Sequence, residues 1–500
     1  MAVERDIVRS NPNAQVDLLN LFTLCSRESP HWRPRDKAIE KFNRKIERFV
    51  KPLISGRDIT GDLHVPVDVP PLPRNFAALR SYEVDGAKVG MAVLSTVTSL
   101  TTMQFPLTLE EFGPVLLPAW RSAHRSLAVG QAVRGLGYDQ VVTFNGRHCY
   151  SRPFCDVLQE TTEVIRYEQA SAGDKYIAVA GSVQEPATLA RLIEAHQFNA
   201  AAGEAFFHER MNRETSSEVG FYTATQRAGQ LPQGMKPGET TTFFTSSSDE
   251  MAAVTDAALY GSFATQHDVA IALAEACKGA GLQLLVRLHP HLRFKNPAWK
   301  REWDFAELER CGVRVLQPDD PSDSYSIVRA SRAVVTCGST IGIEAAYLGV
   351  ANAVVGTWVG GRLGASIEAN TIDELVSFMA KPRPLPDARE RAMLFGSFYK
   401  RAGKPLPELD VGAHPNLARI DGRIVDRVRY PLQKLRFLLS GQSHDPGALD
   451  VRSGTQAGRV VLATGTDYGS ALQQRSQGNA ATSGARKSRR AATENSRSRE

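Results

Sequence analysis

A chain of 500 residues that is 42% hydrophobic and 23% charged has ordinary globular composition and the length for two or three domains. Its net charge of +6 lies mostly at the C-terminus, since nine basic and five acidic residues after position 440 supply four of the six charges. The nearly neutral remainder argues against a nucleic-acid partner, and the lack of an apolar run of ~20 residues argues against an integral membrane protein.

The first half of the chain predicts a weakly structured, partly helical segment over 1–76 and then an α/β domain over 77–225. Apolar and amphipathic stretches predict, in order, a strand, a helix and a strand–helix–strand unit. Their ranges are 88–94, 119–136, 139–144, 153–161 and 163–167. The β–α–β order predicts parallel pairing in a sheet with helices on both faces.

The second half begins with a linker predicted over 226–240, where glycines and prolines cluster. A second α/β domain is expected over 241–440, ending in helices, with the last helix over 423–439. Its other strands and helices are predicted over 241–245, 269–280, 284–288, 333–337, 353–355, 372–379 and 389–401. Small and polar residues dominate after position 440, which predicts a disordered tail over 441–500.

Two segments of the second domain follow predicted strands and carry the residues of a binding site. His289 follows the strand 284–288, and Gly338-Ser339-Thr340 follows the strand 333–337. The carboxyl ends of parallel strands share one edge, where open α/β sheets bind ligands. A glycine and two hydroxyls opening a helix predict an anion site, because unpaired backbone N–H groups face the ligand there. We therefore predict a phosphate or diphosphate held between the imidazole and the helix start.

Each of these residues also has a plainer interpretation. Instead of contacting a phosphate, His289 would cap its strand, and Ser339 and Thr340 would be ordinary helix N-caps. Glu344 shares a helix face with Thr340 and either holds a ribose hydroxyl or pairs with a basic side chain. Ser324 lies in a turn that is predicted to begin a helix, and a simple capping turn is the plainer interpretation.

The first domain offers polar side chains at the ends of two predicted neighbouring strands. Asn145 and Arg147 follow the strand 139–144, and Glu168 ends the next one. Asn145 with its following glycine favours a tight turn, whereas Arg147 suits a carboxylate or phosphate. Glu168 is the candidate general base, with a solvated carboxylate as the alternative. The six cysteines lack metal-ligand spacing and no DxD-like pair stands out, so neither metal nor cofactor is expected.

Five segments, in order, resemble bacterial capsule and surface-polysaccharide biosynthesis proteins of the GT-B glycosyltransferase type over roughly residues 85–400. They are 141–147, 243–250, 287–290, 322–325 and 338–349. The resemblance implies two Rossmann-like domains facing a cleft, with the nucleotide-sugar donor in the second. In sialyl- and Kdo-transferase relatives a His-Pro and a Ser-Ser/Thr motif hold the phosphate of a CMP-sugar, and His289-Pro290 and Ser339-Thr340 match them. CDP-glycerol-type polymerases carry a similar pair.

These relatives often carry an acid-acid-Gly motif in the first domain, where one carboxylate is the base. This chain has only Val84-Asp85-Gly86, which lacks the first acid, so Asp85 ranks behind Glu168 as candidate base.

The resemblance implies a glycosyltransferase that moves a sugar, or a polyol phosphate, from a CMP- or CDP-linked donor to a growing glycan or lipid-linked glycan. The alternatives are a nucleotide-sugar epimerase-type enzyme and a non-catalytic nucleotide-binding scaffold subunit. The polar N-terminus and scattered cysteines predict a cytoplasmic protein. The basic run 486–490 favours peripheral contact with the inner membrane, at about 1 kcal/mol for each basic residue near anionic lipid.

Overall fold

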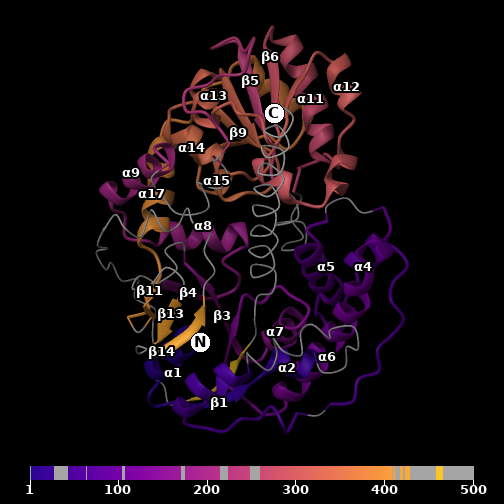
Figure 1. Ribbon diagram of the computed structural model, residues 1–500, viewed down its shortest axis with the longest axis vertical. Coiled ribbons are helices and arrows are strands. Elements are labelled where there is room, and N and C mark those ends of the chain that lie inside the picture. The colour runs from indigo at the N-terminus through magenta and orange to yellow at the C-terminus, as the bar shows by residue number, and fades with distance from the viewer. Residues whose placement is uncertain are drawn as a thin grey trace, which may run out of the picture.

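The computed structural model contains two large sheets, which lie toward opposite ends of the long axis (Figure 1). The residues it describes are 2–26, 43–63, 65–103, 107–170, 175–213, 223, 225–247, 259–407, 409–410, 417–420, 423–427 and 458–464. Both large sheets are mainly parallel and flanked by helices, which confirms the predicted GT-B-like α/β fold class.

The first sheet has six strands in the order β1-β15-β2-β3-β4-β11. Their bounds are β1 Gln15–Leu19, β15 Arg459–Ala463, β2 Gln140–Phe144, β3 Glu163–Gln169, β4 Lys175–Ala180 and β11 Lys404–Pro405. The first four are parallel to one another, and β4 and β11 are antiparallel to their neighbours. The β2–α7–β3 unit was predicted from sequence, and its parallel pairing is confirmed.

Strand β15 overturns part of the predicted disordered tail. It lies between β1 and β2, with Val461 paired to Asp17 on one side and to Val141 on the other. Val461 and Leu462 are fully buried. Small and polar residues surround its apolar run of four, 460–463, so the composition of the tail gave no sign of a strand whose partners lie hundreds of positions away. Apart from 458–464, the residues of 441–500 lie outside the described ranges.

The N-terminal part is more regular than expected. Helix α1 (Ala2–Ser10), strand β1 and helix α2 (Leu21–Ser26) replace the predicted weak structure. The predicted strand over 88–94 is wrong, because residues 89–101 form helix α5 (Val89–Thr101). Every side chain from Val89 to Ser99 is buried, and a fully buried helix shows no apolar stripe to distinguish it from a strand.

The remaining helices of the first half include α6 and α7, which correspond to the helices predicted over 119–136 and 153–161. Their bounds are η1 Lys51–Leu53, α4 Phe76–Arg80, η2 Leu109–Val115, α6 Leu116–Arg134, α7 Arg152–Leu158, α8 Pro186–Glu194 and α9 Ala200–Met211. Residues 43–49 are also helical, within the segment predicted to be partly helical. Helices α8 and α9 pack on α15 (Val359–Arg362) and α17 (Ala388–Arg401) of the second half, and the rings of Phe207 and Tyr347 stack with centroids 4.2 Å apart. Two helices that precede the predicted linker, α8 and α9, therefore pack in the core of the second half.

The second sheet is parallel throughout, in the order β10-β9-β8-β5-β6-β7. Its strands are β5 Thr240–Phe244, β6 Gln283–Arg287, β7 Arg314–Leu316, β8 Ala333–Thr336, β9 Asn352–Val354 and β10 Ile367–Glu368. Its helices are α11 Gln266–Gly279, η4 Pro290–Phe294, η5 Pro297–Glu302, α12 Phe305–Arg310, α13 Ser324–Ala330, α14 Ile341–Tyr347, α15 Val359–Arg362, α16 Ile372–Ala380 and α17 Ala388–Arg401. A capping box formed by Thr371 and Glu374 begins α16.

A small antiparallel sheet follows, made of β12 Leu409–Asp410, β13 Leu417–Ile420 and β14 Arg423–Arg427. The last predicted helix, over 423–439, is therefore wrong for 423–427, and the rest of that range lies outside the described residues. Residues 423–427 form a strand because they pair antiparallel with β13.

Candidate functional site

The central strand of the second sheet, β5, lies between the two strands that the candidate residues follow. From β5 the chain builds β6 and β7 on one side, then returns to place β8 and β9 on the other. Phe244, which ends β5, is in register with Arg287 of β6 and with Thr336 of β8. The carboxyl end of β5 is thus a topological switch point, the position at which open α/β sheets bind ligands.

His289 lies on one side of this switch point. Its backbone N–H donates to Thr245 Oγ1 (2.9 Å), the buried hydroxyl that follows β5. The ring accepts the backbone N–H of His291 at Nδ1 (3.2 Å), so a neutral imidazole carries its proton on Nε2. The His289 side chain is half-buried. The neighbouring His291 is buried.

The turn Gly338-Ser339-Thr340 lies on the other side of β5. Gly338 has φ +81°, a backbone conformation in the left-handed region that favours glycine. All three residues are half-buried. Thr340 occupies the N-cap position of α14, but its side chain makes no cap hydrogen bond. Its Oγ1 instead accepts from the Arg210 guanidinium at 3.4 Å.

Glu344 lies in the first turn of α14 and is almost fully buried. Arg210, in the last turn of α9, donates from Nε to Glu344 Oε1 at 2.6 Å. Of the two roles left open for Glu344, the structure realises the ion pair. Burial, followed by the charge of Glu344, raises the pKa of Tyr325 next to this pair. Sequence analysis missed Arg210, because nothing local relates it to a helix 130 positions away.

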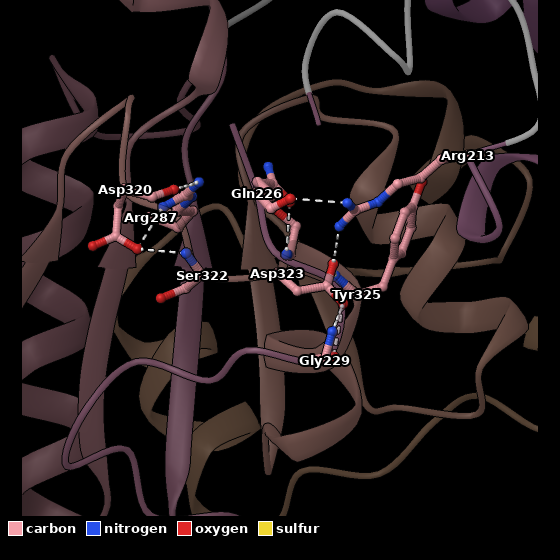
Figure 2. A network of polar contacts seen from close by, with 10 residues as sticks. Arg213, Gln226, Gly229, Arg287, Asp320, Ser322, Asp323 and Tyr325 are labelled. Atoms are coloured by element: carbon pink, nitrogen blue, oxygen red, sulfur yellow. Dashed lines mark hydrogen bonds and ion pairs between the residues drawn. The ribbon is translucent and has the colours of Figure 1, made fainter. Parts of the chain in front are cut away.

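Ser324 belongs to a polar network that fastens the predicted linker to the second sheet (Figure 2). Its backbone N–H donates to Gln226 Oε1 (3.0 Å). The neighbouring Asp323 caps α13 and also accepts from the backbone N–H of Gly229 (3.0 Å) and from Arg213 (3.3 Å). The capping-turn interpretation therefore accounts for this segment, because its polar groups cap α13 and bind the predicted linker.

Arg287 ends β6 just before the His-Pro pair and is 1% exposed. It donates to the backbone carbonyl of Asp320 (3.0 Å), and its NH1 lies 3.4 Å from that carboxylate (Figure 2). Burial lowers the pKa of this guanidinium, and its Nε has no hydrogen-bond partner among the described residues. A buried arginine beneath the carboxyl edge brings positive charge close to the switch point.

A buried carboxyl group lies on the opposite face of the same edge. The backbone N–H of Ser246, just after β5, donates to Gln266 Oε1 (2.8 Å), and the Gln266 backbone N–H donates to Glu302 Oε1 (2.9 Å). Burial raises the pKa of Glu302 to about 8, so this group is largely protonated at neutral pH. Burial raises the pKa of Cys337 as well, with the Glu302 charge as a second cause.

In the first sheet the structure brings three predicted residues together. Asn145 has φ +61°, in the left-handed region, and its side chain donates to Glu168 Oε1 and accepts the backbone N–H of Arg147 (3.1 Å). Gln184 donates to the same Glu168 oxygen at 3.3 Å. Glu168 is half-buried. The Glu168 carboxylate is thus oriented by two side-chain amides that donate to the same oxygen.

Asp85 lies elsewhere. It occupies a tight turn closed by the bridge between Val84 and Ala87, and it accepts from Gln131 at 2.7 Å. Gln131 is in the last turn of α6, which leads into the amino end of β2, whereas Asn145 follows the carboxyl end. The structure does not bring Asp85 together with the other candidates.

Polar contacts join the segment after β2 to α5, and the end of α5 to the segment after β6. Helix α5 approaches the segment after β2, where the Cys149 backbone N–H donates to Thr96 Oγ1 (2.8 Å). Thr102, after the end of α5, accepts from the backbone N–H of Asn296 (3.3 Å), which follows the His289 segment. An ion pair of 2.6 Å also joins η2 to η5.

Two further properties bear on the chemistry of the site. No group of three or more His, Cys, Asp or Glu side chains in the described part of the chain is placed to hold a metal ion. Over the same residues, every helix is too short or too polar to cross a bilayer.

No family model matches this chain, and no curated protein matches it. Solved structures with similar folds include the KpsC β-Kdo 2,4 transferase of Thermosulfurimonas dismutans, at 13% identity and TM-score 0.30, covering 51% of this chain and 87% of that one. The KpsC β-Kdo 2,7 transferase of the same organism has 15% identity and TM-score 0.31, covering 55% and 90%. The UDP-GlcNAc 2-epimerase of Methanocaldococcus jannaschii, solved with UDP-GlcNAc and UDP, has 10% identity and TM-score 0.27, covering 55% and 80%.

Proposed function

We propose that this protein is a glycosyltransferase. It transfers a sugar, or a polyol phosphate, from a CMP- or CDP-linked donor to a growing capsule or surface polysaccharide. The observation that carries the proposal is that His289 and the Ser339–Thr340 turn follow the two strands that flank β5, at the switch point. Both segments are half-buried, so a ligand has access to them.

In the proposed reaction with a nucleotide-sugar donor, the acceptor hydroxyl attacks the anomeric carbon and gives its proton to a carboxylate base, for which Glu168 is the candidate. The bond from that carbon to the donor phosphate breaks, and the nucleotide leaves with the bonding electrons. His289, donating from Nε2, and the hydroxyls of Ser339 and Thr340 stabilise the charge that develops on the leaving phosphate. Asp85 takes no part, because it lies at the other end of β2.

The acceptor is a glycan or a lipid-linked glycan, and the Arg147 guanidinium is suited to an acidic sugar or a lipid phosphate. No metal or cofactor takes part in these steps. The proposed location is the cytoplasm, in peripheral contact with the inner membrane. The basic run 486–490 supports that contact, and it lies outside the described residues.

Thermal-shift measurements with CMP, CDP and UDP test the donor site first. Stabilisation by a cytidine nucleotide supports the proposal. If no nucleotide raises the unfolding temperature, the proposal is wrong. A donor that binds and is isomerised without an acceptor would indicate an epimerase-type enzyme. Nucleotide binding without any turnover would indicate a scaffold subunit.

Substitution of His289 tests the chemical step. His289→Ala should lower transfer by about 10²-fold or more, because a donor to the leaving phosphate is lost. The matched control is His208→Ala, which removes an exposed histidine of α9. Wild-type turnover in His289→Ala, measured as nucleotide release with acceptor present, would rule out the role of this imidazole.

A further inference from the structure

We infer that Arg210 is a ligand-binding residue of the proposed donor site, where its guanidinium contacts the nucleotide phosphate held at the Ser339–Thr340 turn. The inference rests on the proposed function and extends it, because Arg210 comes from helix α9, before the linker. The donor site is then built from both sides of the linker.

The geometry fixes the guanidinium plane at the turn. Arg210 Nε donates to Glu344 Oε1 at 2.6 Å, and NH2 of the same group lies 3.4 Å from Thr340 Oγ1. The guanidinium carbon also lies 5.1 Å from the centroid of the Phe206 ring. Since a guanidinium is planar, the bond to Glu344 directs the NH2 edge to the hydroxyl that ends the turn.

The accessibility of the pair is asymmetric. The Glu344 side chain is 3% exposed, whereas that of Arg210 is 20% exposed. The carboxylate is thus the inner partner that orients the arginine, and the arginine reaches the partly open turn. A buried ion pair adds little net stability over apolar packing, so stability alone gives weak reason for this arrangement. Arginine is over-represented where a planar group of donors binds a phosphate, which gives this arrangement a function.

Two other groups around the turn point independently to a polar ligand. The Nε1 of Trp358 is buried without a hydrogen-bond partner among the described residues, and its ring lies 3.5 Å from where a Cβ of Gly338 would stand. Thr336 is 1% exposed, and its Oγ1 likewise has no partner in the described ranges. That hydroxyl lies beneath the first turn of α14, beside Gly342. Buried polar groups normally have hydrogen-bond partners, so groups without a protein partner around one turn favour a bound anion or an ordered water there.

The experiment separates binding from stability with a pair of substitutions. Arg210→Gln alone leaves the buried Glu344 without its charged partner and is expected to lower stability. The double variant Arg210→Gln/Glu344→Gln replaces the ion pair with two neutral amides and keeps the shape. Arg389→Gln is the matched control, because Arg389 contacts the other end of α14, at the Tyr347 ring and carbonyl.

Binding of CDP and of CMP is measured by calorimetry for wild type and all variants, with thermal unfolding measured in parallel. We expect the double variant to unfold near the wild-type temperature but to bind CDP 10- to 100-fold more weakly, in line with loss of a charge-assisted contact. Arg210→Lys keeps the charge but loses the planar fork, so it should recover part of the affinity. Arg389→Gln should bind as wild type does.

Three outcomes are distinguishable. Weaker binding by a stably folded double variant supports the inference. Wild-type affinity in that variant overturns it and leaves the proposed function intact. Failure of the wild-type protein to bind any nucleotide, cytidine or uridine, overturns both.

Discussion

The two large sheets differ in how the chain builds them. The second sheet takes all six strands from residues 240–368, so each strand pairs with segments close to it in sequence. The first draws on residues 15–19, 140–180, 404–405 and 459–463, and its interior strand β15 comes from near the C-terminus. The strands of the second sheet thus come from one continuous stretch of the chain, whereas the first sheet depends on contacts between segments from distant parts of the chain.

This difference has consequences for folding and stability. Non-local strands must close long loops before their pairing contributes, and such topologies fold slowly. The first sheet should therefore respond to changes far from it in sequence. The second should respond to changes in its own turns and buried polar groups. Three predictions sharpen this contrast, in order of expected size.

The largest effect is expected from removing β15. A chain that ends at residue 457 loses the buried Val460, Val461 and Leu462, at a cost of about 5 kcal/mol or more, which rivals the whole stability of a domain. The first sheet should unfold while the second stays protected. Hydrogen–deuterium exchange of peptides from 140–169 and from 283–336 measures both at once.

A chain that ends at residue 470 keeps the strand and serves as the control. If the shorter chain protects both sets of peptides as the longer one does, β15 does not hold the first sheet together. Protection lost equally in both sets would mean that the two halves fold as one unit.

A smaller effect is expected at the network that binds the linker to the second sheet. Asp323→Ala removes the α13 cap, the acceptor for Gly229 and the partner of Arg213, and should cost about 3 kcal/mol. The control Asp304→Ala removes an exposed cap of α12 and should cost only about 1 kcal/mol. Urea unfolding measures both, and equal costs would show that the linker contacts contribute nothing.

The smallest effect, when it is measured per pH unit, is expected at the buried Glu302. The pKa of Glu302 is about 8 in the folded state against 4.5 as its ordinary value, so the folded chain keeps a proton that the unfolded chain releases. This contribution to stability is complete below pH 4.5 and is lost as pH rises toward 8, by up to about 1.4 kcal/mol per pH unit. Glu302→Gln should remove that slope and be more stable than wild type at pH 8.

Urea unfolding of both proteins between pH 5 and 8 provides the measurement. Glu309→Gln, which changes an exposed carboxyl of α12, is the control and should keep the wild-type slope. Parallel stability curves for wild type and Glu302→Gln would show that the buried carboxyl stays ionised.

The sequence by itself predicted most of the second sheet and the placement of its site. Fully parallel, buried strands read as continuous apolar runs, and the polar residues that end them necessarily share one edge. His289 and Ser339 could therefore be assigned to the same edge without coordinates. Asn145 and Glu168 could be placed together in the first sheet by the same rule.

Only the tertiary structure decided the rest. The strand β15 carries an ordinary run of four apolar residues, and its place between β1 and β2 depends on partners that no local pattern identifies. Helix α5 is buried on all sides, so its sequence lacks the periodicity that identifies a helix. Arg210 reaches the Ser339–Thr340 turn because α9 packs against α14 and α17. Local patterns encode which elements form, but side-chain contacts between distant elements arise only from how those elements pack.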